Sequence, residues 1–193
     1  MEIYLCRHGQ TTGDVEDRYG GDYDDHLTDL GKSQAKDLAD KLQGKGIERV
    51  FVSPKIRAQE TAQILSTTLS IKMETVQDLR ERNQNGVLTG MLRAEAKQQY
   101  PDLVELLKDF NNTIKGAEDY PSFSRRVESA LKLIVKQPCS KIAVVTHGGP
   151  IKAILRLISY SPDYKIEDCA FAELETDNDK LKLVSLNGIV ATN

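Results

Sequence analysis

The chain has 193 residues, of which 39% are hydrophobic and 28% are charged, and its formal net charge at pH 7 is -3. This length suits a single domain over residues 1–193 that buries a core of its own. The charge balance, without a basic stripe, argues against nucleic acid as a partner, and no apolar stretch approaches the ~20 residues that cross a bilayer.

Two elements are predicted in the first quarter of the chain. Residues 2–7, EIYLCR, form a short apolar run that is typical of a buried strand ending at Arg7. Thr28 is placed to cap a helix over residues 29–43. Apolar residues recur at helical spacing along this helix, at Leu30, Ala35, Leu38 and Leu42.

A second strand and a second helix follow. Residues 49–53, RVFVS, are predicted as a strand. Ser53 then serves as the cap of a helix, with Pro54 in its first turn. The apolar face of this helix consists of Ala58, Ala62, Leu65 and Leu69.

The stretch over residues 82–121 is less regular. It contains two short predicted helices, over residues 93–100 and 102–110, joined by polar turns. We interpret the stretch as an insertion that covers the substrate. A long helix over residues 122–137 then begins at Ser122.

The last part of the chain contains the clearest strand, residues 141–146 (KIAVVT). Pro150 opens a helix over residues 151–158, and residues 171–186 alternate in polarity around residues 177–179, which predicts a hairpin. Together these elements predict an α/β fold. We expect a three-layer αβα sandwich whose central sheet is mostly parallel, with the C-terminal hairpin at its edge.

Polar segments follow the carboxyl ends of three predicted strands. They are Arg7-His8-Gly9, then Ser53 with Arg57 on the following helix, and finally His147-Gly148-Gly149. In an open α/β sheet, ligands bind outside the carboxyl ends of the strands. If these strands are parallel neighbours, the three segments converge on one site.

The residue types in these segments suit a tetrahedral dianion. Arg7 and Arg57 supply planar forks that match phosphate oxygens, while helix N-termini and glycine turns supply backbone N–H groups. An imidazole, whose pKa in an unperturbed setting is ~6.5, is neutral for much of the time near pH 7 and can attack phosphorus directly. His8 and His147 therefore indicate phosphoryl transfer, with a separate acid to protonate the leaving alkoxide.

The cysteines and histidines predict no structural zinc site. Cys6, Cys139 and Cys169 are widely separated and lack CxxC spacing, so we expect free, mostly buried thiols in a reducing cytoplasm. The chain has only three histidines and no Cys/His cluster. The N-terminal MEIYLCRHG has an early acid and too short an apolar run for a signal peptide, so a cytoplasmic location is expected.

Five ordered blocks resemble the histidine phosphatase superfamily, also called the phosphoglycerate mutase-like family. RHGQT is similar to the N-terminal signature of that family, and residues 18–35 resemble the segment after it. The other three blocks are SPKIRAQETA, LRERNQNGVLTG and VTHGG. The resemblance runs from Met1 to about Ile158 and points to the phosphatase branch of the family.

The resemblance implies a role for each matching residue. His8 is the nucleophile that becomes phosphorylated, and Glu81 is the proton donor to the leaving group. The rest of the phosphate pocket is formed by Arg7, Arg57 and His147. The residues expected to lie against the substrate are Asp14, Gly20, Gly21 and Gly148. The resemblance implies no metal and no organic cofactor.

Two positions depart from the family pattern. Members often carry Trp-Asn where this chain has Gly13-Asp14, and the asparagine usually touches the phosphate. Because a carboxylate beside a dianion is repelled unless a cation offsets it, we predict that Asp14 pairs with a nearby cation or turns away. Gly86 lies one residue further beyond Glu81 than the pattern has it, which predicts a reshaped loop.

Hydrolysis of a small phosphorylated metabolite is the expected activity. A mutase shares the pocket but must keep water from the phosphohistidine and hold the substrate carboxylate. Between Gly90 and Pro121 the chain carries only scattered cations, at Arg93, Lys97, Lys108 and Lys115, which favours a phosphatase. Mutase-type phosphoryl transfer and a non-catalytic phosphate-binding module are the alternatives. A homo-oligomer is compatible with the sequence.

Overall fold

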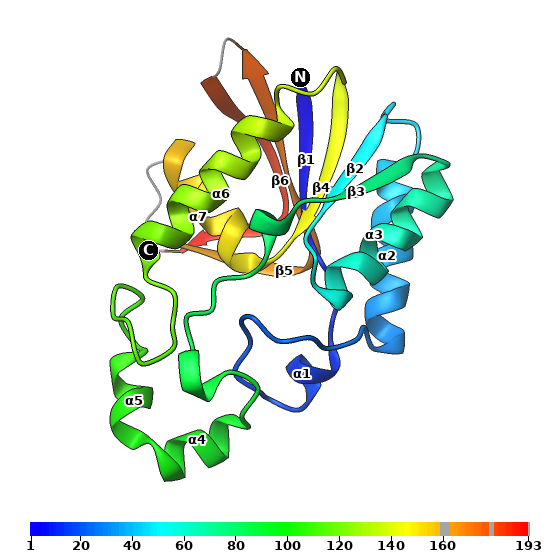
Figure 1. Cartoon of the computed structure of the whole chain (residues 1–193). Helices are drawn as coiled ribbons and strands as arrows, with labels where there is room; N and C mark the ends of the chain where they lie inside the picture. Colours follow the sequence, from blue (N-terminus) through cyan, green and yellow to red (C-terminus); the bar gives the residue numbers. More distant parts are fainter. Residues whose placement is uncertain (159–162, 178–179, 193) are drawn as a thin grey trace.

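The structure is a computed structural model that describes residues 1–158, 163–177 and 180–192. Its centre is a six-stranded sheet with the strand order β3-β2-β4-β1-β5-β6 (Figure 1). The strands are β1 (Glu2–Arg7), β2 (Arg49–Val52), β3 (Lys72–Thr75), β4 (Lys141–Thr146), β5 (Asp163–Asp177) and β6 (Lys180–Thr192). The first four in spatial order are parallel, whereas β5 and β6 run antiparallel to their neighbours.

Helices cover both faces of this sheet. On one face lie α6 (Tyr120–Ile134) and α7 (Gly148–Ile158), and on the other lie α2 (Asp29–Leu42) and α3 (Ile56–Leu69) (Figure 1). The helices enter these layers because each buries one apolar stripe, as Ala35, Leu38 and Leu42 do on α2. The three-layer α/β architecture with an edge hairpin is therefore confirmed.

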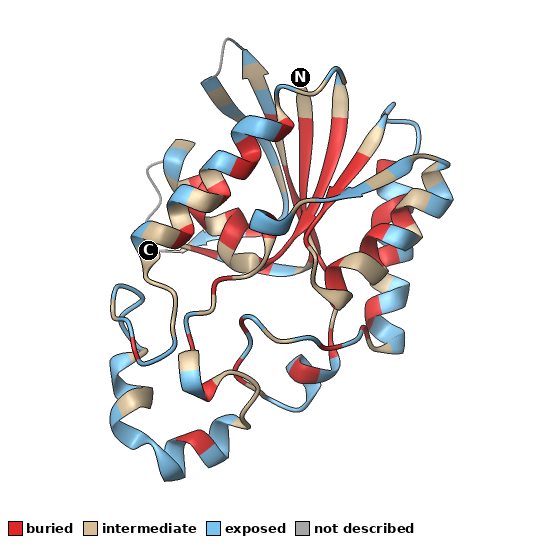
Figure 2. Ribbon diagram, in the orientation of Figure 1, coloured by how far each residue is buried: buried red, intermediate tan, exposed pale blue. Residues whose placement is uncertain are grey.

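The core is divided by the sheet into two apolar clusters. Along β1, Ile3 and Leu5 belong to the cluster under α6 and α7, and Tyr4 and Cys6 belong to the cluster under α2 and α3. All four side chains are at most 1% exposed, since successive side chains of a strand point to opposite faces. Figure 2 shows the central strands buried along most of their length.

A smaller layer lies beyond the carboxyl ends of the parallel strands (Figure 1). It contains α1 (Thr12–Val15), the 3₁₀ turn η2 (Gly86–Leu88), α4 (Arg93–Gln99) and α5 (Pro101–Leu106), while another 3₁₀ turn, η1 (Gln77–Leu79), packs on α6. Tyr19, Leu88, Ala96 and Ile114 form its buried apolar cluster. Among the described residues, no helix is both long and apolar enough to pass through a bilayer.

Three helices begin elsewhere than predicted. Helices α3, α6 and α7 begin at Ile56, Tyr120 and Gly148, not at the predicted Ser53-Pro54, Ser122 and Pro150. The Ser53 hydroxyl contacts His147 Nε2 at 2.7 Å and leaves the first turn of α3 without a side-chain cap. At α6 the cap is Asp119, whose carboxylate accepts a hydrogen bond from the Ser122 backbone N–H at 2.8 Å.

Other differences concern the edges of the sheet and one helix face. Strand β3 is not predicted, because Lys72–Thr75 is an edge strand whose residues are mostly exposed. Strand β5 begins at Asp163, well before residue 171, and residues 178 and 179 of the predicted turn lie outside the described residues. On α2, Leu30 is 53% exposed, so it does not belong to the buried face.

Candidate active site

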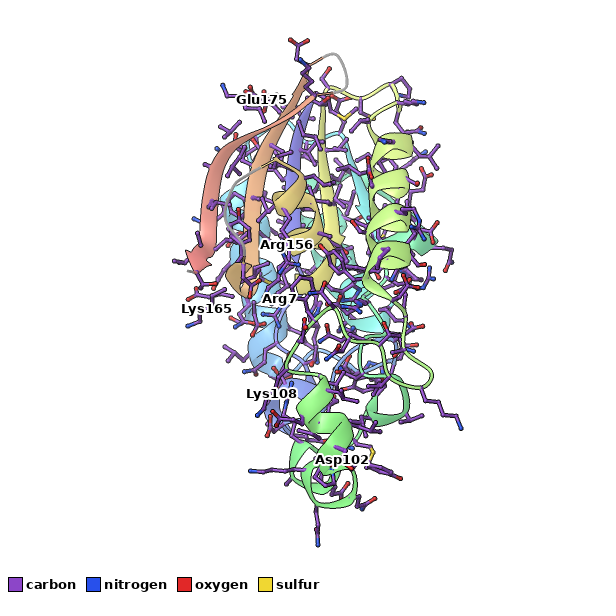
Figure 3. All side chains as sticks on the ribbon, turned by 90° about the vertical axis from the view of Figure 1, so that its left-hand side faces the viewer. Arg7, Asp102, Lys108, Arg156, Lys165 and Glu175 are labelled. Carbon is purple, nitrogen blue, oxygen red and sulfur yellow. The ribbon has the colours of Figure 1, made fainter. Side chains whose placement is uncertain are left out.

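Three parallel strands bring their carboxyl ends to one edge of the sheet. Strands β1 and β2 flank β4 on either side. The backbone N–H of His8 donates to Thr146 O at 3.1 Å, and that of Ser53 donates to Val145 O at 3.0 Å. The segments beyond the strands are therefore held together, as predicted. Figure 3 shows Arg7 at this edge, between the sheet and the segment that carries α5.

The two histidines meet at this edge. The ring centroids of His8 and His147 lie 5.0 Å apart, with an interplanar angle of 63°. His8 Nδ1 lies 2.8 Å from Gly9 O, so this nitrogen carries the proton and donates it, and Nε2 carries the lone pair. His147 Nε2 lies 2.7 Å from Ser53 Oγ.

Arg57 links the two imidazoles. Its Nε–H lies 3.2 Å from His8 Nε2 and 3.2 Å from His147 Nδ1, so both unprotonated nitrogens face one cationic donor. Arg57 is in the first turn of α3 and only 4% exposed. The helix dipole disfavours a cation at a helix N-terminus. An anion bound beside Arg57 would offset this unfavourable interaction.

Burial lowers the pKa of His8 well below its usual range, and the nearby Arg57 and Arg7 guanidiniums lower it further. The pKa of His147 is also lowered, chiefly by burial and then by Arg57 and His8. Both imidazoles are thus neutral at pH 7. A neutral His8 is the form that can attack phosphorus.

The loop before α2 supplies the predicted Gly21 and two residues that the sequence did not indicate, Tyr23 and Asp25. Arg57 Nη1 donates to Asp25 Oδ1 at 2.9 Å and to Tyr23 O at 2.8 Å, and Nη2 donates to Gly21 O at 3.0 Å. Asp25 lies in the acidic run GDYDDH, and nothing in that run distinguishes it from its neighbours. Its role as the partner of Arg57 arises only from tertiary structure.

Arg7 is held by strand β5. Its Nη1 donates to Ile166 O at 2.7 Å, and its Nη2 forms an ion pair with Asp168 Oδ1 at 3.1 Å. Burial raises the pKa of Asp168, while Arg7 opposes that rise. Asp168 was also missed, because no spacing relates a lone aspartate in this strand to a residue near position 7. The contact depends on a register irregularity of β5 between Ile166 and Phe171.

Glu81 reaches the same site from the other side. Its Oε2 accepts a hydrogen bond from the Gly149 backbone N–H at 3.0 Å, and its Oε1 accepts one from Arg82 N at 2.7 Å. The Gly149 bond places the carboxylate at the N-terminus of α7, where the helix dipole favours negative charge. The structure therefore brings Glu81 together with His8, Arg7 and Arg57 around one cavity.

The Asp14 carboxylate is bound by Thr11, three residues before it. Its Oδ2 accepts hydrogen bonds from Thr11 N at 2.9 Å and Thr11 Oγ1 at 2.8 Å, which closes a capping box at α1. Its Oδ1 lies 4.0 Å from Arg7 Nη2. Asp14 thus lies near a cation, as one of the two predicted arrangements has it, but it still lines the cavity and does not turn away from it.

The loop after Glu81 packs against two segments that are distant in the sequence. The Asn85 side chain donates to Gly20 O at 2.9 Å. Gly86 has a φ of +45°, and a Cβ there would lie 2.3 Å from Lys115 O. The shifted glycine therefore packs against the end of the covering stretch.

The cavity formed by these residues has a volume of about 300 Å³. His147 is fully buried and contributes through His8 and Arg57. The lining includes all the other predicted site residues, namely Arg7, His8, Asp14, Gly20, Gly21, Arg57, Glu81 and Gly148. In the described part of the chain, no group of three or more His, Cys, Asp or Glu side chains is arranged to hold a metal ion.

Comparisons with known proteins agree with this geometry. "Phosphoglycerate mutase-like protein 4" of Arabidopsis thaliana is 33% identical over 159 residues, which cover 79% of this chain and 69% of that protein. The alpha-ribazole phosphatase from Shigella flexneri has a TM-score of 0.86 at 25% identity, with 97% of this chain and 96% of that chain covered.

A mycobacterial glucosyl-3-phosphoglycerate phosphatase shares the fold, with a TM-score of 0.83 at 22% identity over 97% of this chain and 99% of that one. The family model that matches, over residues 3–188, is that of the histidine phosphatase superfamily (branch 1). The match spans both histidine segments and every strand in between. The chain belongs to the histidine phosphatase superfamily, branch 1.

Proposed function

We propose that the protein is a phosphomonoesterase that hydrolyses a small phosphorylated metabolite through a phosphohistidine on His8. One observation carries the proposal. The His8 Nδ1–H is committed to Gly9 O at 2.8 Å, so the lone pair is on Nε2. There it accepts the Arg57 Nε–H at 3.2 Å and must exchange that hydrogen bond for the phosphorus atom when it attacks. A phosphoryl group drawn in by Arg57 and Arg7 would arrive at the nucleophilic nitrogen.

In the first half-reaction, His8 Nε2 attacks phosphorus and the P–O bond to the alcohol breaks. The alkoxide takes a proton from the Glu81 carboxylic acid, so the alcohol leaves neutral. Arg7 and Arg57 balance the charge on the equatorial oxygens of the transferring group, and the buried His147 holds Arg57 from behind.

In the second half-reaction, water attacks the phosphohistidine. The Glu81 carboxylate takes one proton from that water as the P–N bond breaks, and inorganic phosphate is released. His8 regains its lone pair and Glu81 is again an acid, so no group is consumed. The Gly149 and Arg82 backbone N–H groups that bind Glu81 would keep it aimed at the same oxygen position in both halves.

The test is turnover of a generic aryl phosphate between pH 5 and pH 8, with rapid quenching to trap an acid-labile phosphohistidine. We expect turnover and a trapped intermediate in the wild type, and neither in His8→Ala. Residual turnover in His8→Ala would contradict the covalent mechanism. A wild type without turnover or intermediate would instead favour a phosphate-binding module.

We further propose that residues 82–121 form an insertion within a single domain and shape the leaving-group side of the cavity. Arg82, Gln84, Asn85 and Arg93 from this stretch contribute to the lining. Mutase-type transfer is the second candidate, in line with the name of the Arabidopsis relative. A panel of phosphorylated metabolites, with analysis for both inorganic phosphate and rearranged ester, separates hydrolysis from transfer.

We also propose that the reaction needs no metal ion and takes place in the cytoplasm. Arg7 and Arg57 supply the positive charge that a metal would otherwise provide, so turnover should persist in excess EDTA. The three free cysteines, of which Cys6 and Cys169 are buried, suit a reducing compartment. Fractionation of the source cells would test the location.

A further inference from the structure

The loop before α2 binds the Arg57 guanidinium through hydrogen bonds. Gly21 O, Tyr23 O and Asp25 Oδ1 together accept three of its N–H groups. A guanidinium has five N–H donors, and here the Nε–H is shared by the two imidazoles. By this count, within the described residues, one Nη2 N–H is left for a ligand.

Asp25 supplies the negative charge among these three acceptors. Its side chain is 7% exposed and that of Arg57 is 5% exposed, so the ion pair is nearly sealed from water. A buried charge is costly unless it is paired. Because the guanidinium is planar and rigid, holding Nη1 and Nη2 also fixes the direction of the Nε–H.

The orientation of Asp25 depends in turn on Tyr23 and Gly13. The Tyr23 hydroxyl donates to Asp25 Oδ2 at 3.3 Å. A Cβ on residue 13 would lie 1.9 Å from Tyr23 Oη and 2.8 Å from Asp25 Oδ2. Only a glycine at position 13 leaves room for this pair, which gives a physical reason for one of the two departures from the family pattern.

We propose that Asp25 is a positioning residue for phosphoryl transfer, an inference that rests on the proposed function. Its ion pair fixes Arg57 so that the remaining Nη2 N–H faces a phosphate at His8, while the Nε–H stays on the two imidazoles. Asp25 acts through Arg57 and takes no part in bond making. The alternative is a purely structural clamp that attaches the loop to α3.

Three variants separate these roles. Asp25→Ala removes the charge and the acceptor, whereas Asp25→Asn keeps the shape and one acceptor oxygen. Glu60→Ala is the matched control, because Glu60 on α3 holds the same loop through Leu27 N at 2.7 Å and His26 Nδ1 at 2.7 Å. Glu60 is not part of the cavity lining. Each variant is measured for kcat and KM with an aryl phosphate, for Tm, and for calorimetric affinity for inorganic phosphate.

We expect kcat of Asp25→Ala to fall by about 10²-fold, since misplacing a stabilising group by ~1 Å costs that much. Its Kd for phosphate should rise about tenfold, as when one charged contact is lost. Asp25→Asn should recover about tenfold of the lost kcat and remain about tenfold below the wild type. Glu60→Ala should lower Tm and change kcat by less than about threefold, as a substitution outside the reacting groups does.

Equal losses of kcat in Asp25→Ala and Glu60→Ala would overturn the proposal, as would an unchanged phosphate Kd in Asp25→Ala. If Asp25→Ala does not fold, Asp25→Asn decides: a lower kcat at unchanged Tm supports positioning, and an unchanged kcat overturns it. If the wild type itself has no turnover and no phosphohistidine, the proposed function fails. The phosphate affinities still decide the role of Asp25 in that case.

Discussion

At the scale of single residues, the site combines two neutral imidazoles with two arginines that each have a carboxylate partner. Asp25 pairs with Arg57 and Asp168 pairs with Arg7. Each carboxylate therefore fixes the direction of a guanidinium that lines the cavity.

Burial and the two arginines lower the pKa of His8, so its imidazole becomes protonated only below the usual pH of about 6.5. The acid limb of the pH profile of kcat/KM should therefore lie below about pH 6.5. The measurement is kcat/KM for an aryl phosphate from pH 4.5 to pH 8. In Arg7→Gln, which lacks one of the cations, the limb should move to higher pH. Since the substrate titrates identically for both proteins, an identical limb in both would show that His8 is not the titrating group.

Asp14→Asn should lower KM by about threefold and leave kcat nearly unchanged. The carboxylate lines the cavity and lies 4.0 Å from Arg7, so removing its charge removes a repulsion against a dianionic ester. Asp29→Asn, at the exposed start of α2, is the matched control for net charge. Asp14 has no role at the phosphate if Asp14→Asn and Asp29→Asn give equal KM values and equal pH profiles.

At the scale of elements, the N-terminus of α7 positions the carboxyl group of Glu81. The Gly149 N–H binds Glu81, and a Cβ at Gly149 would lie 2.1 Å from Glu81 Oε1. A side chain at this position therefore displaces the carboxylate. The helix can hold Glu81 this closely only with glycine in its first turn.

Gly149→Ala should reduce kcat by about 10²-fold for an alkyl phosphate, which needs a proton for its leaving group, and by much less for an aryl phosphate. Steady-state kinetics with matched alkyl and aryl esters checks this. Gly148→Ala, where a new Cβ meets nothing within 4 Å, is the control for folding, and both variants should keep the wild-type Tm within a few degrees. A loss that is equal for both esters would exclude displacement of the acid as its cause.

The sequence predicted the elements that carry strong local signals. The apolar runs of β1 and β4, followed directly by His8 and His147, indicate where the site is. Strand β3 was not predicted because an exposed edge strand has no apolar run. Two helices begin at other residues than predicted because Ser53 makes a tertiary contact and Asp119 is a cap. Such contacts leave no periodic trace in the sequence.

For the site, too, only the residues with a local signal in the sequence could be predicted. Residues adjacent to strand ends, together with the family resemblance, gave the four phosphate-pocket residues and Glu81, whose chemical roles stay predictions. Tyr23, Asp25 and Asp168 come from a loop and from an irregular strand. Their positions depend on how distant segments pack, which one sequence does not encode in any local pattern.

At the scale of the whole molecule, the buried neutral histidines make stability depend on pH. The pKa values of His8 and His147 are lower in the folded state than the ~6.5 of an unfolded chain. Below about pH 6.5 the unfolded state thus binds more protons, and the free energy of unfolding decreases as pH falls. Above about pH 6.5 the histidines are neutral in both states, and the protein keeps the full free energy of unfolding that is lost at lower pH.

Urea unfolding at pH 7.5 and pH 5.5 should therefore give a lower free energy of unfolding at pH 5.5. His147→Gln removes one of the two titrating groups, so its difference between the two pH values should be smaller than that of the wild type. Equal stability of the wild type at both pH values would mean that the histidines are not held neutral by burial.

The central position of β1 also bears on how the chain folds during its synthesis. Strand β1 is made first, yet its partners are β4 and β5, which are paired through residues 141–146 and 171–175. Such non-local pairing slows folding, because long loops must close before any contact forms. On the ribosome, β1 and the His8 segment after it stay without their sheet until β4 and β5 have emerged. A nascent chain stalled before β4 would thus expose an apolar strand and depend on chaperones to stay unaggregated.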